Sequence, residues 1–378
     1  MDRVLHLFNH FGALTERVFL DYTLGLSKQG FDLTIGYETL CEGASEVPFR
    51  QVKLGRVSVE PTADIPAQML FLAHHVEDAA RQSLLEERYD LIHGHFGPRI
   101  LQGAAWLQRG VPMIVSVYGY DVGRLLRDPC WIERYRWAAE NGAIFVTLAR
   151  FMEEKLLDLG LPRKSVRRIH LGIDLAEHAF DPKPAPASPR FVFIGRFVDK
   201  KGADVLINAM AHLTRDMKTP ATLDLIGGGP NEISLREQVA HLQVSSAVNF
   251  VGLVSFAQIF DYLNDCTALV QPSVTAPDGD AEGAPMVLMT AQASGVPCIT
   301  TRHSGNPETI PPAGQRFVVP ERDPIALARA MKAMIDLSPV DRGALQTDGR
   351  GWIVEKYNLE QTVSQYAALY REMISDVR

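Results

Sequence analysis

Short runs of apolar and β-branched residues alternate along the chain with longer stretches in which apolar residues recur every three or four positions. In the first half, the short runs predict strands at Val4–Phe8, Phe31–Tyr37, Leu91–His93, Met113–Val117 and Ile144–Thr147. The longer stretches predict helices at Thr15–Gln29, Ala67–Glu87, Ile100–Arg109 and Arg150–Leu159. Alternating strands and helices are typical of a parallel sheet with helices on both faces, so the pattern predicts an α/β fold.

The alternation begins again after a proline-rich segment, Asp181–Pro189, which holds four prolines in nine residues. Proline fixes φ and lacks a backbone N–H, so this segment continues neither a helix nor a central strand. A final amphipathic helix is predicted at Gln361–Ile374. Between these segments the pattern predicts a helix at Ala203–Leu213 and strands at Phe191–Ile194, Leu223–Ile226, Ala247–Val251, Ala268–Gln271, Pro297–Thr300 and Arg316–Val319.

The length of 378 residues suits two domains of about 150–200 residues each. We therefore expect two Rossmann-like domains, at 1–180 and 190–358, joined by a stiff linker at 181–189, with a last helix at 359–378. Open α/β sheets bind ligands beyond the carboxyl ends of their strands. Two sheets that face a central cleft would place both binding edges in one site.

Composition narrows the possible functions. The net charge of −7 argues against a nucleic-acid partner, because such binding needs a basic surface. The first residues show a strand pattern rather than a signal peptide, and no apolar run approaches the ~20 residues of a membrane span. The four cysteines lie far apart and indicate reduced, buried thiols in a cytoplasmic protein: Cys41, Cys130, Cys266 and Cys298.

An acidic, glycine-rich loop follows the predicted strand Ala268–Gln271 and opens directly into a helix. Helix starts present unpaired N–H groups and partial positive charge, which suit a phosphate. A carboxylate beside such a start, here Glu282, suits sugar hydroxyls, so the loop indicates an activated sugar donor. The alternatives are a solvated surface loop and a calcium site of Asp278, Asp280 and Glu282, although the ligand series of an EF-hand is not completed.

This stretch resembles the retaining glycosyltransferases of the two-domain GT-B type, in the large group 1, family 4-like class. The resemblance is densest at Asp278-Gly-Asp-Ala-Glu-Gly283 and Ala291-Gln-Ala-Ser-Gly-Val-Pro-Cys-Ile299, and it covers nearly the whole chain. It implies that Glu282 holds a hydroxyl of the donor sugar, while the amides of Gly283 to Met286 approach the sugar and phosphate. Relatives carry a second Glu, which binds the nucleotide ribose, where this chain has Thr290. The resemblance also implies that the final helix crosses back onto the first domain.

A second motif, Phe193–Gly202, places Arg196 and Lys201 on either side of a turn from strand to helix. Arginine offers a planar fork and lysine a point charge, so the pair can neutralise a diphosphate leaving group. A solvated basic turn is the alternative. The resembling family has the same Gly-Arg-(four residues)-Lys-Gly pattern at its donor diphosphate, which implies transfer without a metal ion or other cofactor. The predicted donor site comprises Gly12, Arg196, Lys201, Leu253, Glu282, Gly283, Ala284, Pro285 and Thr290.

The loop after the first strand, Asn9–Glu16, is the third candidate. Gly12 permits close backbone approach to a ligand, and Thr15 or Glu16 suits the start of the next helix. In the resembling family this loop lies over the donor phosphate and the acceptor. Ordinary chemistry of a strand-to-helix turn is the alternative.

A fourth segment, Ser116–Val122, carries Tyr118 where many relatives have a histidine near the reacting carbon of the sugar, while Asp121 is retained. Tyrosine can hydrogen-bond a sugar but is a poor base at neutral pH. The resemblance implies that the leaving phosphate itself accepts the acceptor's proton. The residues expected to act in transfer are Glu282, Tyr118, Arg196 and Lys201, with Asp121 and His95 on the acceptor side.

His93 and His95 lie two positions apart at a predicted strand end, as in the similar His-x-His-Phe-Gly of relatives. Two histidines can begin a metal site, but no third ligand of suitable spacing is visible, so we expect them to line the cleft. The segment His170–Asp174 resembles the one that closes the family's first domain, and it serves either the hinge or the site.

A basic cluster at 163–168 and the nearby aromatics at 131–137 suit either a lipid surface or a solvated helix face. The sequence therefore predicts a retaining, metal-independent hexosyltransferase that uses a nucleotide-sugar and a sugar or lipid-linked saccharide acceptor in polysaccharide or glycoconjugate biosynthesis. It would be cytoplasmic, with peripheral contact to the inner face of the membrane. Two alternatives are an enzyme of the same fold with a different phosphorylated donor, for which Tyr118 and Thr290 speak, and a non-catalytic binding protein.

Overall fold

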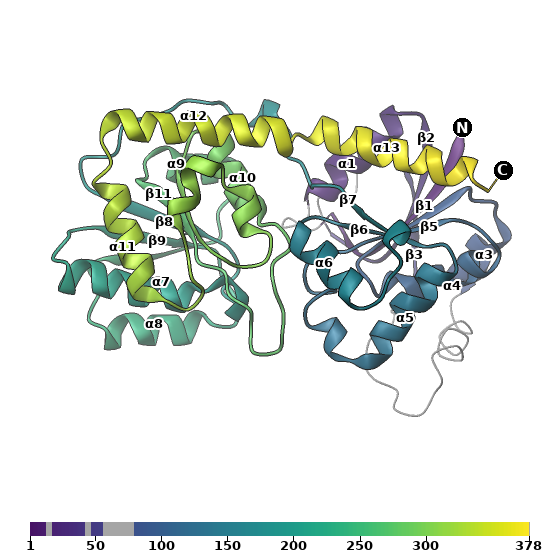
Figure 1. The fold of residues 1–378 in the computed structure, drawn as a ribbon, viewed down its shortest axis with the longest axis horizontal. Coiled ribbons are helices and arrows are strands. Elements are labelled where there is room, and N and C mark those ends of the chain that lie inside the picture. Colours follow the sequence, from purple (N-terminus) through teal and green to yellow (C-terminus); the bar gives the residue numbers. More distant parts are fainter. Residues whose placement is uncertain (13–16, 42–46, 56–78, 378) are drawn as a thin grey trace. The chain divides into compact units, whose positions relative to one another are not determined.

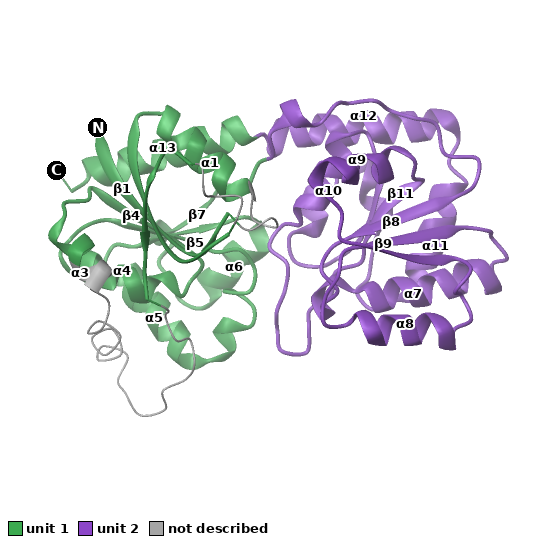
Figure 2. Ribbon diagram, turned by 180° about the vertical axis from the view of Figure 1, so that it is seen from behind, with its two compact units in different colours: residues 1–172, 359–378 green, residues 173–358 purple. Residues whose placement is uncertain are grey.

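The computed structural model describes residues 1–12, 17–41, 47–55 and 79–377. The chain forms two compact units, shown in green and purple in Figure 2. Unit 1 comprises Met1–Gly172 and Leu359–Arg378, and unit 2 comprises Ile173–Asn358. The division after Gly172 comes earlier than the proline-rich segment 181–189, whose Lys183 carbonyl accepts hydrogen bonds from Arg342 and Gln346 of unit 2. The segment thus packs on unit 2 instead of standing free between the units.

Unit 1 is built on a parallel sheet in which the seven described strands have the order β3-β2-β1-β4-β5-β6-β7 (Figure 1). These strands are β1 Asp2–Phe11, β2 Phe31–Leu40, β3 Arg50–Lys53, β4 Leu91–His95, β5 Met113–Ser116, β6 Ile144–Thr147 and β7 Val166–Arg168. The packed helices are α1 Arg17–Lys28, α3 Ala79–Glu86, α4 Arg99–Gln108, α5 Pro129–Glu140, α6 Arg150–Asp158 and α13 Leu359–Ser375. Helix α13, yellow in Figure 1, packs on α1, where a Cβ added at Gly25 would lie 2.4 Å from Val363.

Unit 2 repeats this plan with the strand order β10-β9-β8-β11-β12-β13. Its strands are β8 Arg190–Ile194, β9 Thr222–Ile226, β10 Val248–Gly252, β11 Ala268–Gln271, β12 Cys298–Thr301 and β13 Val318–Val319. Its α-helices are α7 Ala203–Ala211, α8 Glu232–His241, α9 Phe256–Asn264, α10 Met286–Ala293, α11 Pro324–Ile335 and α12 Pro339–Lys356. The central strands are apolar on both faces and fully buried, as helices on both sides of a parallel sheet require.

The predicted α/β pattern is confirmed, with local differences at element ends. Strands β3 and β7 and helix α5 were not predicted. The two strands are short and charged, and α5 was considered only for its aromatic and basic surface. The helix expected at Ala203–Leu213 is α-helical to Ala211 and continues as one π turn. Of the helix expected at Ala67–Glu87 only Ala79–Glu86 is described, and Thr15 and Glu16 also lie outside the described residues.

Each sheet has one place where the strand order reverses, between β1 and β4 in unit 1 and between β8 and β11 in unit 2. The loops that leave two adjacent strands in opposite directions there open a crevice at the carboxyl edge, where such sheets bind ligands. The predicted motifs follow these four strands. Among the described helices, none is long and apolar enough to cross a membrane.

Candidate active site

The loops after β8 and β11 bring Lys201 and Glu282 together at the reversal point of unit 2. Lys201 Nζ lies 2.8 Å from Glu282 Oε1, and the side chains are only 15% and 10% exposed. Beside them, Lys200 Nζ lies 3.0 Å from Asp280 Oδ1 and packs the acidic loop onto the basic turn. Two motifs about 80 residues apart in the sequence therefore form one charged site.

Glycines give the basic turn its shape. Gly202 has φ 67°, and a Cβ at this position would lie 2.0 Å from the carbonyl oxygen of Pro272. Gly227 has φ 137°, and a Cβ there would lie 1.9 Å from the oxygen of Gly195. Only glycine fits such a backbone at so close an approach. Arg196 projects from this turn, is exposed, and has no hydrogen-bond or ion-pair partner among the described residues.

The charge of Glu282 is stabilised although the residue is buried. Burial alone would raise its pKa, but the ammonium groups of Lys201 and Lys200 outweigh that effect and lower the pKa. The contact with Lys201 is short enough for an ion pair, but its angles do not make Oε1 the acceptor of an aligned hydrogen bond. We regard it as a charge contact for this reason. Oε1 therefore retains acceptor capacity that a ligand hydroxyl can fill.

A supporting histidine fixes the backbone of the acidic loop, and sequence reasoning missed it. The backbone N–H of Glu282 donates to His303 Nε2 at 3.0 Å, so His303 carries its proton on Nδ1 and donates to Glu321 Oε1 at 2.7 Å. Burial raises the pKa of Glu321, but the hydrogen bonds from His303 and the Thr275 amide lower it overall. The only sequence signal was a histidine two residues after β12, at the same carboxyl edge of the sheet.

The other predicted donor residues surround this site at different depths. Gly283, Ala284 and Pro285 lead from Glu282 into the N-terminus of α10. Thr290 is buried within α10, and Leu253, which follows β10, is 84% exposed. Gly12 belongs to unit 1, where it follows β1 with φ 80°. Whether each of these residues contacts a donor stays a prediction.

In unit 1, Asp121 holds the loop that carries Tyr118. Its Oδ1 accepts the backbone N–H groups of Tyr118 at 2.8 Å and Gly119 at 3.0 Å, and its Oδ2 accepts that of Gly97 at 3.2 Å. Burial raises the pKa of Asp121 to about 6, against these hydrogen bonds. Because Asp121 is fully buried and its oxygens are used by the backbone, it shapes the loop rather than presenting a carboxylate to an acceptor.

His95, expected on the acceptor side, is also fully buried, and the structure adds a third histidine that sequence reasoning did not find. His6 on β1 lies beside His93 and His95 on β4, and one ring nitrogen of each lies within 4.8 Å of the others. His6 stands 87 residues before His93, so no spacing signal joined them. Burial lowers the pKa of His6 to about 3 and those of His93 and His95 well below their usual range, so all three are neutral.

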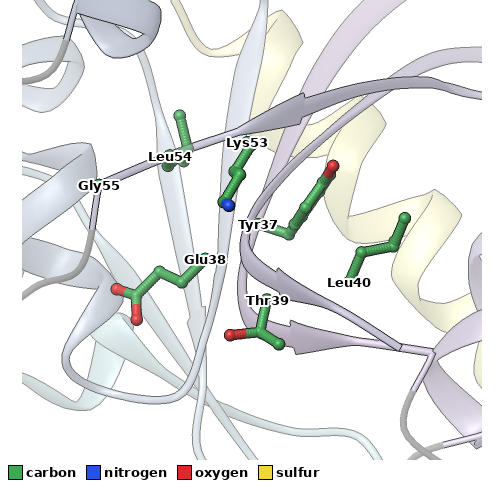
Figure 3. Close-up of a pocket in the computed structure, with 7 residues that line it drawn as sticks. All are labelled: Tyr37, Glu38, Thr39, Leu40, Lys53, Leu54 and Gly55. Atoms are coloured by element: carbon green, nitrogen blue, oxygen red, sulfur yellow. The ribbon is translucent and has the colours of Figure 1, made fainter. Parts of the chain in front are cut away.

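A polar hollow of about 540 Å³ opens at the carboxyl ends of β2 and β3 in unit 1 (Figure 3). Glu38 contributes its carboxylate, and Arg99 Nη1 donates to Glu38 Oε1 at 2.6 Å from the buried side. Burial lowers the pKa of Arg99 against the effect of Glu38. Sequence reasoning missed this hollow, whose lining residues are Tyr37, Glu38, Thr39, Leu40, Lys53, Leu54 and Gly55.

The two Rossmann-like units and the charged loop pair define a protein of the GT-B class. The sequence matches the family described as glycosyl transferases group 1 over residues 176–352, and the family described as glycosyltransferase family 4 over residues 15–177. The chain therefore belongs to the group 1, family 4-like glycosyltransferases.

Individual proteins agree with this assignment. A GDP-mannose-dependent α-(1-6)-phosphatidylinositol monomannoside mannosyltransferase of Mycolicibacterium smegmatis is 25% identical over 93% of both chains. WcaL of Escherichia coli K12, named for colanic acid biosynthesis, is 27% identical over 76% of this chain and 71% of its own. Among solved structures, sucrose-phosphate synthase from Thermosynechococcus elongatus matches with a TM-score of 0.76 at 21% identity over 100% of both chains. Anabaena HepE with UDP and glucose matches with 0.76 at 15% identity, over 98% of this chain and 100% of its own. These two structures support the fold alone.

Proposed function

We propose that this glycosyltransferase moves a sugar, with retention of configuration, from a nucleotide-sugar to a saccharide or lipid-linked saccharide. The observation that carries the proposal is the Lys201–Glu282 pair at the reversal point of unit 2. A cation suited to a diphosphate and a carboxylate suited to a sugar hydroxyl stand 2.8 Å apart, next to a helix start that suits an anion. A donor in which sugar and diphosphate are joined matches this order of groups.

In the proposed mechanism the protein stabilises the leaving group rather than supplying a strong base. Arg196 and Lys201 neutralise the diphosphate as the bond to the sugar breaks, and the N–H groups at the start of α10 add to the same effect. Glu282 accepts a hydrogen bond from a donor-sugar hydroxyl through its unfilled Oε1. The departing phosphate oxygen takes the proton of the acceptor hydroxyl. With these cations in place, the reaction needs no divalent metal.

The named relatives support the substrate classes. One is GDP-mannose-dependent and acts on a phosphatidylinositol mannoside, another is named for an exopolysaccharide, and HepE is described with UDP-glucose. We propose by analogy that this chain works in polysaccharide or glycolipid assembly in the cytoplasm. The hollow of Figure 3 is our candidate for the acceptor saccharide, because it is polar and lies at the carboxyl edge of its sheet.

Peripheral contact with an anionic membrane is part of the same proposal. Arg163, Lys164, Arg167 and Arg168 line a second hollow of about 630 Å³ in unit 1. Glu153 forms ion pairs with Arg163 and Arg168, which leaves a net positive rim. Exposed Phe151 on α6 is next to this surface in the sequence and offers an apolar contact. Binding to vesicles with and without anionic lipid, with a charge-reversed Arg167→Glu variant, tests this part separately.

The deciding experiment is a donor panel. Release of nucleoside diphosphate is measured for UDP-, GDP- and ADP-sugars, with and without saccharide acceptors, and the anomeric configuration of the product is read by NMR. Transfer with a retained configuration supports the proposal, and inversion contradicts the mechanism. Binding of a different phosphorylated sugar without any nucleotide-sugar turnover would support the other-donor alternative that Thr290 suggests.

A further inference from the structure

The three buried histidines of unit 1 belong to one hydrogen-bonded chain that ends at Tyr118. The chain joins residues from β1, β4, the β5 region and α13. Its links are Tyr366 to Ser116 at 2.8 Å, Ser116 to His93 Nε2 at 2.8 Å, His93 Nδ1 to Tyr370 at 2.5 Å, Tyr370 to His6 Nε2 at 3.3 Å, His6 Nδ1 to His95 Nε2 at 3.1 Å, and His95 Nδ1 to Tyr118 at 2.8 Å.

Proton counting gives this chain a direction. A neutral histidine carries one N–H, so each ring must receive a hydrogen bond at one nitrogen and donate at the other. The chain can therefore run only as a whole, either from Tyr366 towards Tyr118 or from Tyr118 towards Tyr366. The low pKa values of the three rings exclude a charged imidazole that would donate at both nitrogens near neutral pH.

Tyr22 decides between the two directions. Its hydroxyl lies 2.8 Å from His95 Nε2, the nitrogen that also meets His6. If Nε2 accepts, Tyr22 donates to it and every buried hydroxyl hydrogen has a partner. If Nε2 donates, the buried hydroxyl hydrogens of Tyr22 and Tyr366 have no acceptor among the described residues, and a buried donor without a partner is costly.

We propose that the chain runs from Tyr366 to Tyr118, and that it positions the Tyr118 hydroxyl as a hydrogen-bond donor to a substrate oxygen. His95 Nδ1–H donates to the Tyr118 oxygen, which leaves the Tyr118 hydrogen as the one not used inside the chain. Tyr118 is also the half-buried member, whereas the other six are buried. His6, His93 and Tyr370 are then positioning residues that act through His95. The substrate's identity rests on the proposed function, but the direction of the chain does not.

The same histidines have the residue types of a metal site, and this alternative is an outcome of the test. Every one of their six ring nitrogens already has a hydrogen-bond partner in unit 1. A bound ion would have to break several of these links, and no carboxylate lies in the cluster that would balance its charge.

The direction is tested in ligand-free protein by NMR with ¹⁵N-labelled histidine, which tells the proton-bearing nitrogen of each ring. The expected result is Nδ1–H on His6, His93 and His95. Tyr118→Phe assigns the His95 signal, and Tyr370→Phe those of His6 and His93. Nε2–H on His95, a charged ring, or about one equivalent of bound metal in the purified protein would each overturn the proposal. This result does not depend on any transferase activity.

The role of the donor is tested by kinetics once a substrate pair is found. Tyr118→Phe should lower kcat/KM about 10- to 100-fold, the range for one hydrogen bond to a charged or developing-charge oxygen. Tyr370→Phe should lower it in the wild-type background and have no further effect in Tyr118→Phe. Tyr89→Phe removes another buried tyrosine hydroxyl of unit 1 and should be neutral. Equal losses from Tyr370→Phe in both backgrounds would show a merely structural role and refute the positioning.

Discussion

Replacing Lys201 by methionine removes the charge opposite Glu282 and keeps the length of the side chain. Glu282 is nearly buried and its pKa is lowered in the wild type, so the pair stabilises unit 2 above the ordinary pKa of the carboxyl group. That contribution is lost as the pH falls through the lowered pKa. In the variant, burial is opposed only by the more weakly acting Lys200 and His303, so the pKa of Glu282 rises. The destabilisation should therefore be largest near pH 8 and shrink towards pH 5.

The magnitude follows from the burial. Removing one partner of a fully buried pair costs about 3–5 kcal/mol, and an exposed pair contributes under about 1 kcal/mol. Because these side chains keep 15% and 10% of their exposure and Lys200 remains nearby, we expect about 2 kcal/mol at pH 8. Urea unfolding followed by hydrogen exchange of peptides from unit 2 measures this value for that unit alone.

Two variants make the test specific. Lys332→Met removes an exposed lysine that pairs with Asp336 one helical turn away and should cost under about 0.5 kcal/mol. Glu282→Gln together with Lys201→Met should recover most of the loss, because no charge is then left unpaired. A Lys201→Met protein as stable as the wild type at pH 8, or one whose loss grows towards pH 5, would refute the reasoning.

The remaining predictions concern the donor and the turn that holds it. Nucleoside diphosphate affinity should fall by about 1.5–3 kcal/mol in Arg196→Ala, the range for a charge-assisted hydrogen bond, and unchanged calorimetric affinity would contradict that assignment. Turnover should survive chelator, and loss of turnover that Mg²⁺ or Mn²⁺ restores would contradict the metal-free mechanism. Thr290→Glu should preserve or tighten nucleotide binding if the donor is a nucleotide-sugar, and a tenfold loss (~1.4 kcal/mol) would count for another donor. Gly202→Ala should lower the urea midpoint and weaken binding, because its Cβ meets a backbone oxygen, whereas the helical Gly343→Ala meets open space and should be neutral or stabilising by up to ~1 kcal/mol.

The architecture followed from the sequence because its signals are local. Buried parallel strands give apolar runs, and ten of them were placed within one or two residues, among them β6 and β11 at their observed bounds. The pairing of Lys201 with Glu282 was also expected, because residues that follow adjacent strands of a parallel sheet meet at one edge. Strands β3 and β7 were missed because short edge strands with Arg50, Lys53 and Arg168 carry little apolar pattern.

The parts of the site that were missed depend on contacts between residues far apart in the chain. His303 supports Glu282 from 21 residues away, and Arg99 meets Glu38 across 61. His6 joins His95 across 89 residues, and no local period marks it. The burial of Asp121 was hidden for a related reason: a conserved-looking carboxylate in a loop has the same letters whether it faces solvent or accepts three backbone amides.

The place of α13 in unit 1 has a consequence for how the protein is made. Tyr370 bonds His93 across 277 residues, and Tyr366 bonds Ser116 across 250. On the ribosome, the first 172 residues emerge long before the helix that fills this face of their core, whereas unit 2 is continuous from Ile173 to Asn358. Unit 2 can therefore finish folding first, although it is synthesised second. Removing the last 20 residues from the gene should consequently destabilise the opposite end of the chain, with the imidazoles of His6 and His93 newly open to water.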